Sequence, residues 1–164
     1  MNVLEKIKEV KNYYKKNYGI KLTKKQLKVL KSKDEIVRET FLRQEGCSTA
    51  AMIKAIEFAI NNERSTVLFI NENKNTAYMR KDDMKNMLLN KDLKKHVLNA
   101  TKNPAIIDFI NGSQIKVISG YANVRGLKAD CVIIEPAGFI GEDVVQSAML
   151  CNCHSKIRQT VILN

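Results

Sequence analysis

The chain has 164 residues, of which 45% are hydrophobic and 27% charged, as in a single globular domain that buries its own core. No apolar run approaches the roughly 20 residues that a membrane-spanning helix needs, and the first residues lack the apolar stretch of a signal peptide. These features exclude a membrane or secreted protein and predict a cytoplasmic one, and the formal net charge of +11 favours a polyanionic partner.

Positive charge is concentrated in residues 1–33. This segment contains eleven lysines and two acids, Glu5 and Glu9, and so carries a net charge of +9, whereas the other 131 residues carry +2. Such a density favours nucleic acid as partner, although a solvated, lysine-rich helix surface fits the composition equally well. We therefore expect a basic helical segment over 1–33 that would contact DNA, and a single core domain over 34–164.

Two helices are predicted in the basic segment. Residues 3–18 carry apolar side chains at helical spacing, and Gly19 ends the pattern. Thr23 can cap a second, shorter helix that carries Leu27 and Leu30.

The core then begins with a strand, a turn and a helix. Ile36–Leu42 predicts a strand, Arg43–Thr49 is a polar turn, and Thr49 to about Asn62 predicts a helix with one apolar face. Thr66–Ile70 is a continuous apolar run, which is typical of a buried parallel strand.

The middle of the chain is expected to hold two helices and a hairpin. Asn75–Leu89 and Lys91–Ala100 have helical patterns. Ile106–Ile110 and Gln114–Ser119 flank Asn111-Gly112, which is a strong signal for a tight β-hairpin.

The last third predicts a strand over Ala129–Glu135, a helix over Asp143–Cys151 and a final strand over Arg158–Leu163. Strands that alternate with helices imply an α/β fold, with a mostly parallel sheet flanked by helices and one β-hairpin. In such sheets ligands bind at the carboxyl ends of the strands, which directs attention to the loops Arg43–Ser48 and Glu135–Gly141.

The loop between the first core strand and helix is a candidate phosphate-binding loop, because a helix N-terminus offers free N–H groups and a positive dipole end. A P-loop reads G-x-x-x-x-G-K-[ST]. Gly46 and Ser48 fit this pattern, whereas Phe41 stands at the first glycine position and Cys47 at the lysine position. Taken alone the match is weak, because strand–turn–helix units with one glycine are common.

The surroundings of this loop strengthen the interpretation. Gln26 lies on a short helix before the first strand, and Val132–Glu135 is an apolar strand that ends in a carboxylate. That arrangement presents an acid to a metal–nucleotide complex. A basic loop, Val124–Asp130, precedes the acid strand.

Taken together, these motifs resemble the ATPase domain of tailed-phage large terminases, the DNA-packaging motor proteins, and the resemblance extends from about Leu22 to Asn164. Those domains typically lack the first P-loop glycine, so its absence here agrees with the family. The resemblance implies a RecA-like P-loop NTPase fold. It is carried, in chain order, by Gln26, Arg43-Gln44-Glu45-Gly46-Cys47-Ser48-Thr49, Asn111-Gly112-Ser113, Arg125-Gly126-Leu127-Lys128-Ala129-Asp130 and Glu135-Pro136-Ala137-Gly138-Phe139-Ile140.

The resemblance also implies roles for individual residues. Gln26 would face the adenine of ATP, and Arg43 would be the loop arginine that reaches the γ-phosphate. Ser48 and Glu135 would hold Mg²⁺, with Glu135 as the metal-side acid. The implied nucleotide-binding set is Gln26, Arg43, Gln44, Gly46, Cys47, Ser48 and Thr49, and Arg125 and Gly126 form the loop before the acid strand.

Two positions depart from the family in ways that remove chemistry. Cys47 replaces the lysine that acts as a point charge on the β- and γ-phosphates, and a thiol cannot do so. Pro136 replaces the second acid, which polarises the attacking water. Losing one such group costs about 10²–10³ in rate, so ATP and Mg²⁺ are doubtful cofactors. Glu45 adds a carboxylate to the same loop and would oppose a low-pKa thiolate at Cys47.

Three functions remain open. The first is a degenerate terminase-like domain that acts as a binding, assembly or regulatory component in viral DNA packaging, in the cytoplasm of the host cell. Its partners would be DNA through 1–33, and terminase subunits, the portal or a second copy of the chain. The second is an active packaging ATPase fragment that partner subunits complete. The third is a nucleic-acid-binding module with no nucleotide role.

Overall fold

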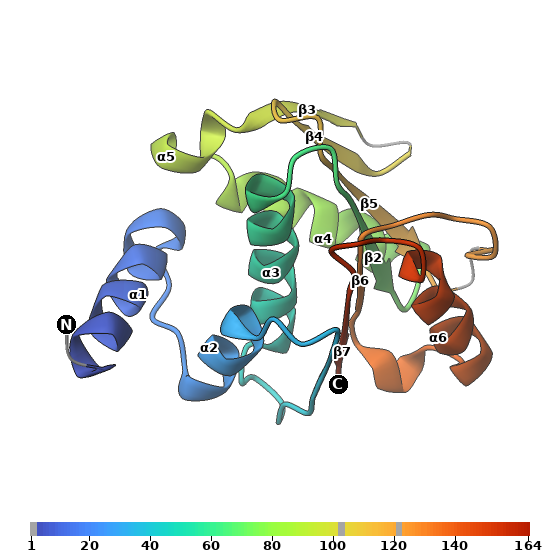
Figure 1. The fold of residues 1–164 in the computed structure, drawn as a ribbon, viewed down its shortest axis with the longest axis horizontal. Coiled ribbons are helices and arrows are strands. Elements are labelled where there is room, and N and C mark those ends of the chain that lie inside the picture. Colours follow the sequence, from blue (N-terminus) through green and yellow to red (C-terminus); the bar gives the residue numbers. More distant parts are fainter. Residues whose placement is uncertain (1–2, 102–103, 121–122) are drawn as a thin grey trace.

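The computed structural model describes residues 3–101, 104–120 and 123–164; residues 1 and 2 of the predicted basic segment lie outside the described residues. At its centre is a seven-stranded sheet with the order β1-β7-β6-β2-β5-β4-β3 (Figure 1). The strands are β1 (Ile36–Glu39), β2 (Thr66–Asn71), β3 (Val97–Thr101), β4 (Ile106–Phe109), β5 (Gln114–Ser119), β6 (Cys131–Ile134) and β7 (Gln159–Leu163).

Five of these strands, β1, β7, β6, β2 and β5, run parallel, whereas β4 is antiparallel to β5, and β3 to β4. The predicted hairpin is confirmed as β4 and β5, and Gly112 in its turn has φ +80, a backbone conformation that favours glycine. The predicted fold class, a mostly parallel sheet flanked by helices, is also confirmed.

Helices cover both faces of the sheet. Alternate residues of the central strands face opposite sides: Val67 and Phe69 of β2 belong to one core cluster, whereas Leu68 and Ile70 belong to another. The first cluster packs under α3 and α4, and the second under α6 (Figure 1). The helices are α1 (Val3–Tyr18), α2 (Lys24–Lys31), α3 (Cys47–Asn61), α4 (Lys74–Met87), α5 (Lys91–Lys94) and α6 (Glu142–Met149), with short 3₁₀ turns at Ala137–Phe139 and Leu150–Asn152.

The basic segment packs against the outer side of α3. Tyr14 and Leu30 form a third apolar cluster with Ile53 of α3. The hydroxyls of Tyr13 and Tyr18 both donate to the Glu57 carboxylate, also on α3. Apolar contact and hydrogen bonds to a charged acceptor therefore hold α1 in place.

Part of one predicted helix is a strand instead, and several predicted boundaries are displaced. Lys91–Ala100 does not form one helix: α5 ends at Lys94, and the following residues form β3 because they pair with β4. The tertiary pairing overrides the local helical pattern. The first strand stops at Glu39 rather than Leu42, and α3 begins at Cys47 rather than Thr49. None of the described helices has the length and apolar character that would let it span a membrane.

Candidate functional site

The predicted phosphate loop connects β1 to α3 at the carboxyl edge of the parallel strands, and β6 ends beside it. A groove of about 510 Å³ lies there, lined by most of residues 40–49 and by Glu135, Pro136, Phe139 and Asn164. Gly46 precedes α3 with φ +79, and a Cβ at this position would clash with the Gln26 carboxamide. The loop conformation therefore requires glycine at this position.

Gln26 lies beneath the loop and supports it. Its Oε1 accepts from the Thr23 N–H at 2.9 Å, while its own backbone N–H donates to the Thr23 hydroxyl at 3.2 Å, completing the capping box of α2. Its Nε2 donates to the Gly46 carbonyl at 3.0 Å. Gln26 is 4% exposed, so the carboxamide predicted to face adenine is engaged with the backbone in this structure.

Glu45 is turned away from the groove. One of its carboxylate oxygens accepts from the Leu42 N–H at 2.6 Å and from Lys25 Nζ at 2.9 Å. The bond from Leu42 and then that from Lys25 lower the pKa of the Glu45 carboxyl below its usual value. The carboxylate stabilises the turn and is neutralised by a lysine of the basic segment.

Ser48 and Glu135, the two predicted metal ligands, are brought together as expected. The Ser48 hydroxyl donates to Glu135 Oε1 at 2.7 Å. Glu135 is 3% exposed, and Asn71 at the end of β2 donates to its backbone carbonyl at 2.7 Å. In the described part of the chain, Asn71 Oδ1 is buried without a hydrogen-bond partner.

The structure adds one residue that sequence reasoning missed. Arg80 of α4 places Nη2 at 2.9 Å from Ser48 Oγ and Nε at 3.4 Å from Glu135 Oε2, and its Nη1 lies 3.3 Å from Asp83 Oδ2. No local sequence pattern distinguishes Arg80. The sequence of α4 is that of an ordinary helix, and the residues that Arg80 contacts lie 32 and 55 positions away in the chain.

Cys47, at the lysine position, is the first residue of α3 and lines the groove. Burial, and then the Glu135 carboxylate, raise the pKa of the Cys47 thiol to about 12, against a smaller lowering by Arg80. A low-pKa thiol, considered for this helix N-terminus, is therefore excluded. The opposing acid is Glu135 rather than Glu45.

The other predicted residues divide between two edges of the sheet. Arg43, Gln44 and Thr49 line the groove, with Arg43 and Gln44 exposed. Arg125 and Gly126 are exposed in the loop before β6, so they lie at the amino end of the strand whose carboxyl end leads to Glu135. Within one chain the structure does not bring Arg125 to the groove.

The fit of Mg²⁺ can be judged from the donor set. A hydroxyl and a carboxylate are suitable ligands for this ion beside phosphates. Here, however, Ser48 bonds directly to Glu135, and the Arg80 guanidinium bonds to both. With Arg80 in this position the site does not fit a divalent cation.

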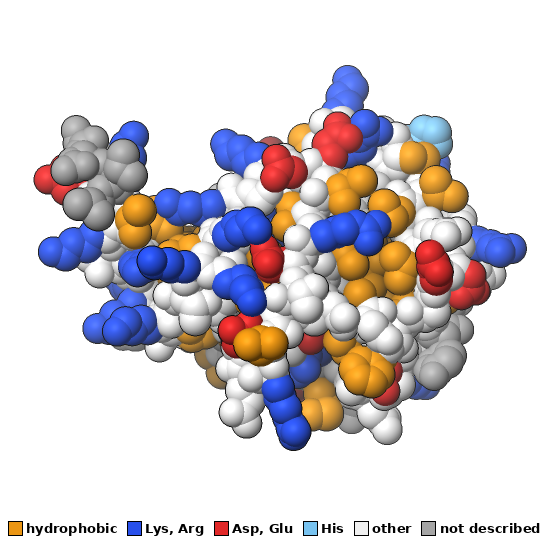
Figure 2. All heavy atoms as spheres, turned by 90° about the horizontal axis from the view of Figure 1, so that it is seen from below, with side chains coloured by type: hydrophobic (Ala, Val, Ile, Leu, Met, Phe, Trp, Pro, Cys, Tyr) orange, Lys and Arg blue, Asp and Glu red, His pale blue; other side chains and the backbone are white. Residues whose placement is uncertain are grey.

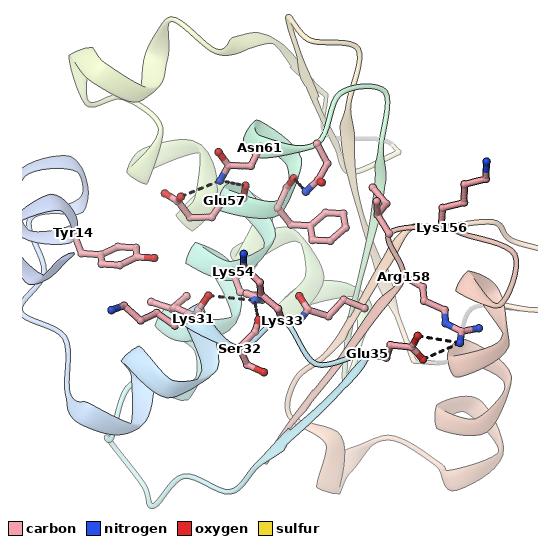
Figure 3. Close-up of a pocket in the computed structure, with 15 residues that line it drawn as sticks. Tyr14, Lys31, Ser32, Lys33, Glu35, Lys54, Glu57, Asn61, Lys156 and Arg158 are labelled. Carbon is pink, nitrogen blue, oxygen red and sulfur yellow. Dashed lines mark hydrogen bonds and ion pairs between the residues drawn. The ribbon is translucent and has the colours of Figure 1, made fainter. Parts of the chain in front are cut away.

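A second hollow, the basic cleft, lies at the opposite edge of the sheet, beside the amino ends of β1 and β7. Its volume is about 660 Å³. Figure 3 shows Lys31 and Lys33 on one side and Lys156 and Arg158 on the other, with Arg158 turned onto Glu35. Lys54 points inward, and its Nζ donates to the Leu30 and Ser32 carbonyls at the end of α2.

Surface charge is unevenly distributed around the carboxyl edge. Figure 2 views the molecule from the side on which the C-terminus lies in Figure 1. Lysine and arginine side chains crowd the end formed by α1, whereas hydrophobic side chains gather on the other half of this face. The charge asymmetry of the sequence is therefore also an asymmetry of the surface.

Comparison with solved structures places this fold among phage large-terminase ATPase domains. The ATPase domain of the Thermus phage P74-26 large terminase superimposes with a TM-score of 0.76 at 17% identity, over 93% of this chain and 68% of that one. The bacteriophage HK97 large terminase gives 0.77 at 11% identity, over 88% and 33%. The large terminase of a thermophilic bacteriophage, in complex with ATP-γ-S, gives 0.69 at 15%, over 87% and 37%.

These likenesses are structural. No protein-family model matches the chain, and no curated protein matches it in sequence. The chain spans about a third of the length of the HK97 large terminase and of the terminase solved with ATP-γ-S. At 11–17% identity the comparisons establish a shared RecA-like P-loop fold.

Proposed function

We propose that this chain is a terminase-like component of viral DNA packaging whose nucleotide loop has lost efficient hydrolysis, and that it works as a binding, assembly or regulatory part. The observation that carries the proposal is the groove at the carboxyl edge. It has the loop, the helix N-terminus and the acid strand of a P-loop site, but it is lined by Cys47 and Pro136 where that chemistry needs a lysine and a second acid.

The proposed loss of hydrolysis concerns two requirements of phosphoryl transfer. Charge on the β- and γ-phosphates must be neutralised, and the attacking water must be oriented. The Cys47 thiol stays neutral because its pKa is raised to about 12, and proline has no group that orients water. Binding of a phosphate chain does not require the lysine or the second acid, because the N–H groups at the start of α3 still offer hydrogen-bond donors.

Nucleotide remains a reasonable ligand of this groove. The large terminase of the thermophilic bacteriophage has been solved with ATP-γ-S and with ADP, and the present chain shares its fold. Arg43 and Gln44 line the groove and are accessible to a ligand there. We keep Arg43 as the residue that would contact the γ-phosphate and Thr49 as a loop neighbour of the phosphates.

DNA is the proposed partner of the basic segment. The exposed lysines of α1 and α2 are joined by Lys156 and Arg158 of the basic cleft, which lies away from the groove. Lysine and arginine on one surface attract the phosphate backbone without reading its sequence. Terminase subunits, the portal or a second copy of this chain are the proposed protein partners.

The experiment compares ATP binding with ATP turnover. Purified protein is titrated with ATP and Mg²⁺ by calorimetry, and phosphate release is measured beside a Cys47→Lys/Pro136→Glu variant. We expect binding with phosphate release near background for the unmodified chain, and phosphate release clearly above background in the variant, because each restored group contributes about 10²–10³ in rate.

Efficient turnover by the unmodified chain alone would reject the proposal. Turnover that arises only when a partner subunit is added would favour an active ATPase fragment, for which Arg125, exposed far from the groove of its own chain, is a candidate contribution to a neighbour. No binding of nucleotide by either protein, together with DNA binding, would favour a nucleic-acid module.

A further inference from the structure

Arg80 connects the groups that hold phosphate and metal in a P-loop site. Its guanidinium donates to Ser48 Oγ at 2.9 Å and to Glu135 Oε2 at 3.4 Å. Of the described lysines and arginines, Arg80 alone makes a hydrogen bond or ion pair with either of these residues. It therefore supplies positive charge beside a loop whose own lysine is replaced by Cys47.

Arg80 also has the capacity to take a further ligand. Its third hydrogen bond is to Asp83, one turn along the same helix, at 3.3 Å. A guanidinium has five N–H donors, so two remain after Ser48, Glu135 and Asp83. Its side chain is 24% exposed, and the guanidinium contacts Ser48 and Glu135, two residues that line the groove.

We propose that Arg80 is the phosphate-binding cation of this groove, in place of both the loop lysine and the divalent metal ion, so that the groove binds a polyphosphate without Mg²⁺. This role of Arg80 rests on the proposed function, because its ligand is the phosphate chain of a nucleotide or inorganic polyphosphate. It goes further by naming an anchor outside the loop and a metal-free mode of binding.

The position and the charge of Arg80 both favour binding without a metal ion. In P-loop sites the metal ion lies between the loop hydroxyl and the strand acid, where it offsets the charge of both acid and phosphates. Here the guanidinium contacts the same hydroxyl and acid, and it pairs with the buried Glu135 carboxylate. A divalent cation would have to displace Arg80 or lie next to its charge, so the two cations compete.

The geometry suits a phosphate as ligand. Arginine binds phosphate through its planar fork of N–H donors more specifically than a lysine point charge does. The backbone N–H groups at the start of α3 add donors and a positive dipole end at the same place. Asp83 is half exposed, with 46% of its side chain accessible, so solvent screens its repulsion of the ligand.

The test uses the full chain and two probes, inorganic tripolyphosphate and ATP, titrated by calorimetry in EDTA and in Mg²⁺. We expect both probes to bind in EDTA, and Mg²⁺ to leave that affinity unchanged or to weaken it. Arg80→Met should reduce affinity in EDTA at least about tenfold, because it removes charge-assisted bonds to phosphate, whereas Arg80→Lys should retain part of it. Lys85→Met, an exposed charge removal on the same helix, is the matched control and should bind normally.

Removing Arg80 alone leaves the buried Glu135 carboxylate without its cation, so Arg80→Met/Glu135→Gln keeps the test informative if the single variant unfolds. This double variant should also lose EDTA binding. In a folded Arg80→Met protein, Ser48 and Glu135 become available to metal, so the remaining binding should depend on Mg²⁺. A purely structural role for Arg80 would not produce this reversal.

The outcomes separate the two proposals. Binding that requires Mg²⁺ in the unmodified chain, or that is equal in Arg80→Met and Lys85→Met, overturns the role of Arg80 while leaving nucleotide binding intact. Absence of binding in every condition overturns both the role of Arg80 and the nucleotide part of the proposed function.

Discussion

At the residue scale, neighbours distant in sequence decide what the loop residues do. The position of Cys47 at a helix N-terminus predicts a reactive thiol, but burial and the Glu135 carboxylate keep the thiol protonated. The position of Glu45 predicts a negative charge that would repel the phosphates. In the structure, Lys25 and the Leu42 N–H both donate to its carboxylate. Local context alone misjudges both side chains.

The Cys47 environment predicts low thiol reactivity. With a pKa of about 12, only about one Cys47 in 10⁴ is a thiolate at pH 8, compared with about one in four for an ordinary cysteine. Iodoacetamide at pH 8, followed by peptide mass spectrometry, should therefore label the exposed Cys153 at least about a hundredfold faster than Cys47.

Glu135→Gln provides the control, because it removes the charge that opposes ionisation of Cys47. Labelling of Cys47 should become faster in this variant, while Cys153 should not change. Equal labelling of Cys47 and Cys153 in the unmodified chain would contradict the assignment.

At the scale of elements, one acid on α3 contributes to holding α1 against the core. Glu57 accepts from the hydroxyls of Tyr13 and Tyr18, and Tyr14 packs beside them with the apolar residues of α2. Burial and the Glu57 charge raise the pKa of the Tyr18 phenol above its ordinary value of 10.0. Glu57 therefore adds polar attachments to the apolar contacts that hold the basic helix.

Tyr18→Phe should loosen this attachment. The loss of a hydrogen bond to a charged acceptor is expected to reduce the free energy of unfolding by about 1–3 kcal/mol, seen in urea unfolding and as faster amide exchange in α1. The raised pKa means that the folded state keeps the phenol proton longer than the unfolded state. Stability should therefore fall as pH rises above about 10, and Tyr18→Phe should reduce that fall.

Tyr78→Phe makes the same chemical change on α4, where the ring contacts Lys74, and it should leave exchange in α1 unaltered. If α1 exchanges equally fast in the Tyr18 and Tyr78 variants, Glu57 does not hold the helix.

At the scale of the whole molecule, two surfaces are separated by the sheet. The groove lies at the carboxyl edge and the basic cleft at the amino edge. The proposed polyphosphate and DNA sites therefore lie at opposite edges and do not overlap. The lysines of α1 extend the positive surface beyond the core (Figure 2).

The basic surfaces should determine the salt dependence of DNA binding. Replacing Lys31, Lys33 and Lys156 of the basic cleft by Gln should weaken duplex binding, and should reduce the slope of log K against log[salt] by about two to three, since each lost phosphate contact contributes about 0.9. The same measurement on Lys8, Lys11 and Lys15 of α1 tests the helix separately. Fluorescence anisotropy over a range of salt concentrations provides the slope.

A triple Gln variant of Lys85, Lys94 and Lys128, three exposed lysines outside the basic segment and the cleft, changes net charge by the same amount. This control variant should change the slope less than the triple variant of the basic cleft or the triple variant of α1. An equal effect in all three variants would mean that DNA responds only to total charge.

The order of elements, the sheet class, the hairpin and the loop at the start of α3 could be predicted from sequence because each depends on short-range signals. Continuous apolar runs, the Asn111-Gly112 turn and the Thr23 cap act within a few residues, and the structure contains the strands, the hairpin and the capped helix that they predict. The strand β3 could not be predicted from such signals, because its conformation depends on pairing with β4.

The sequence by itself determined that Cys47 carries no ammonium group and that Pro136 carries no carboxylate, because the identity of a side chain fixes what it can ionise. Only the tertiary structure decided which groups replace or oppose them. Arg80, Ser48 and Glu135 come from α4, α3 and the end of β6, and they meet because parallel strands bring their carboxyl ends to one edge. Arg80 lies 32 and 55 positions along the chain from its two partners, and contacts at such separations leave no local sequence pattern. The proposed metal-free cation site is therefore visible only in the folded structure.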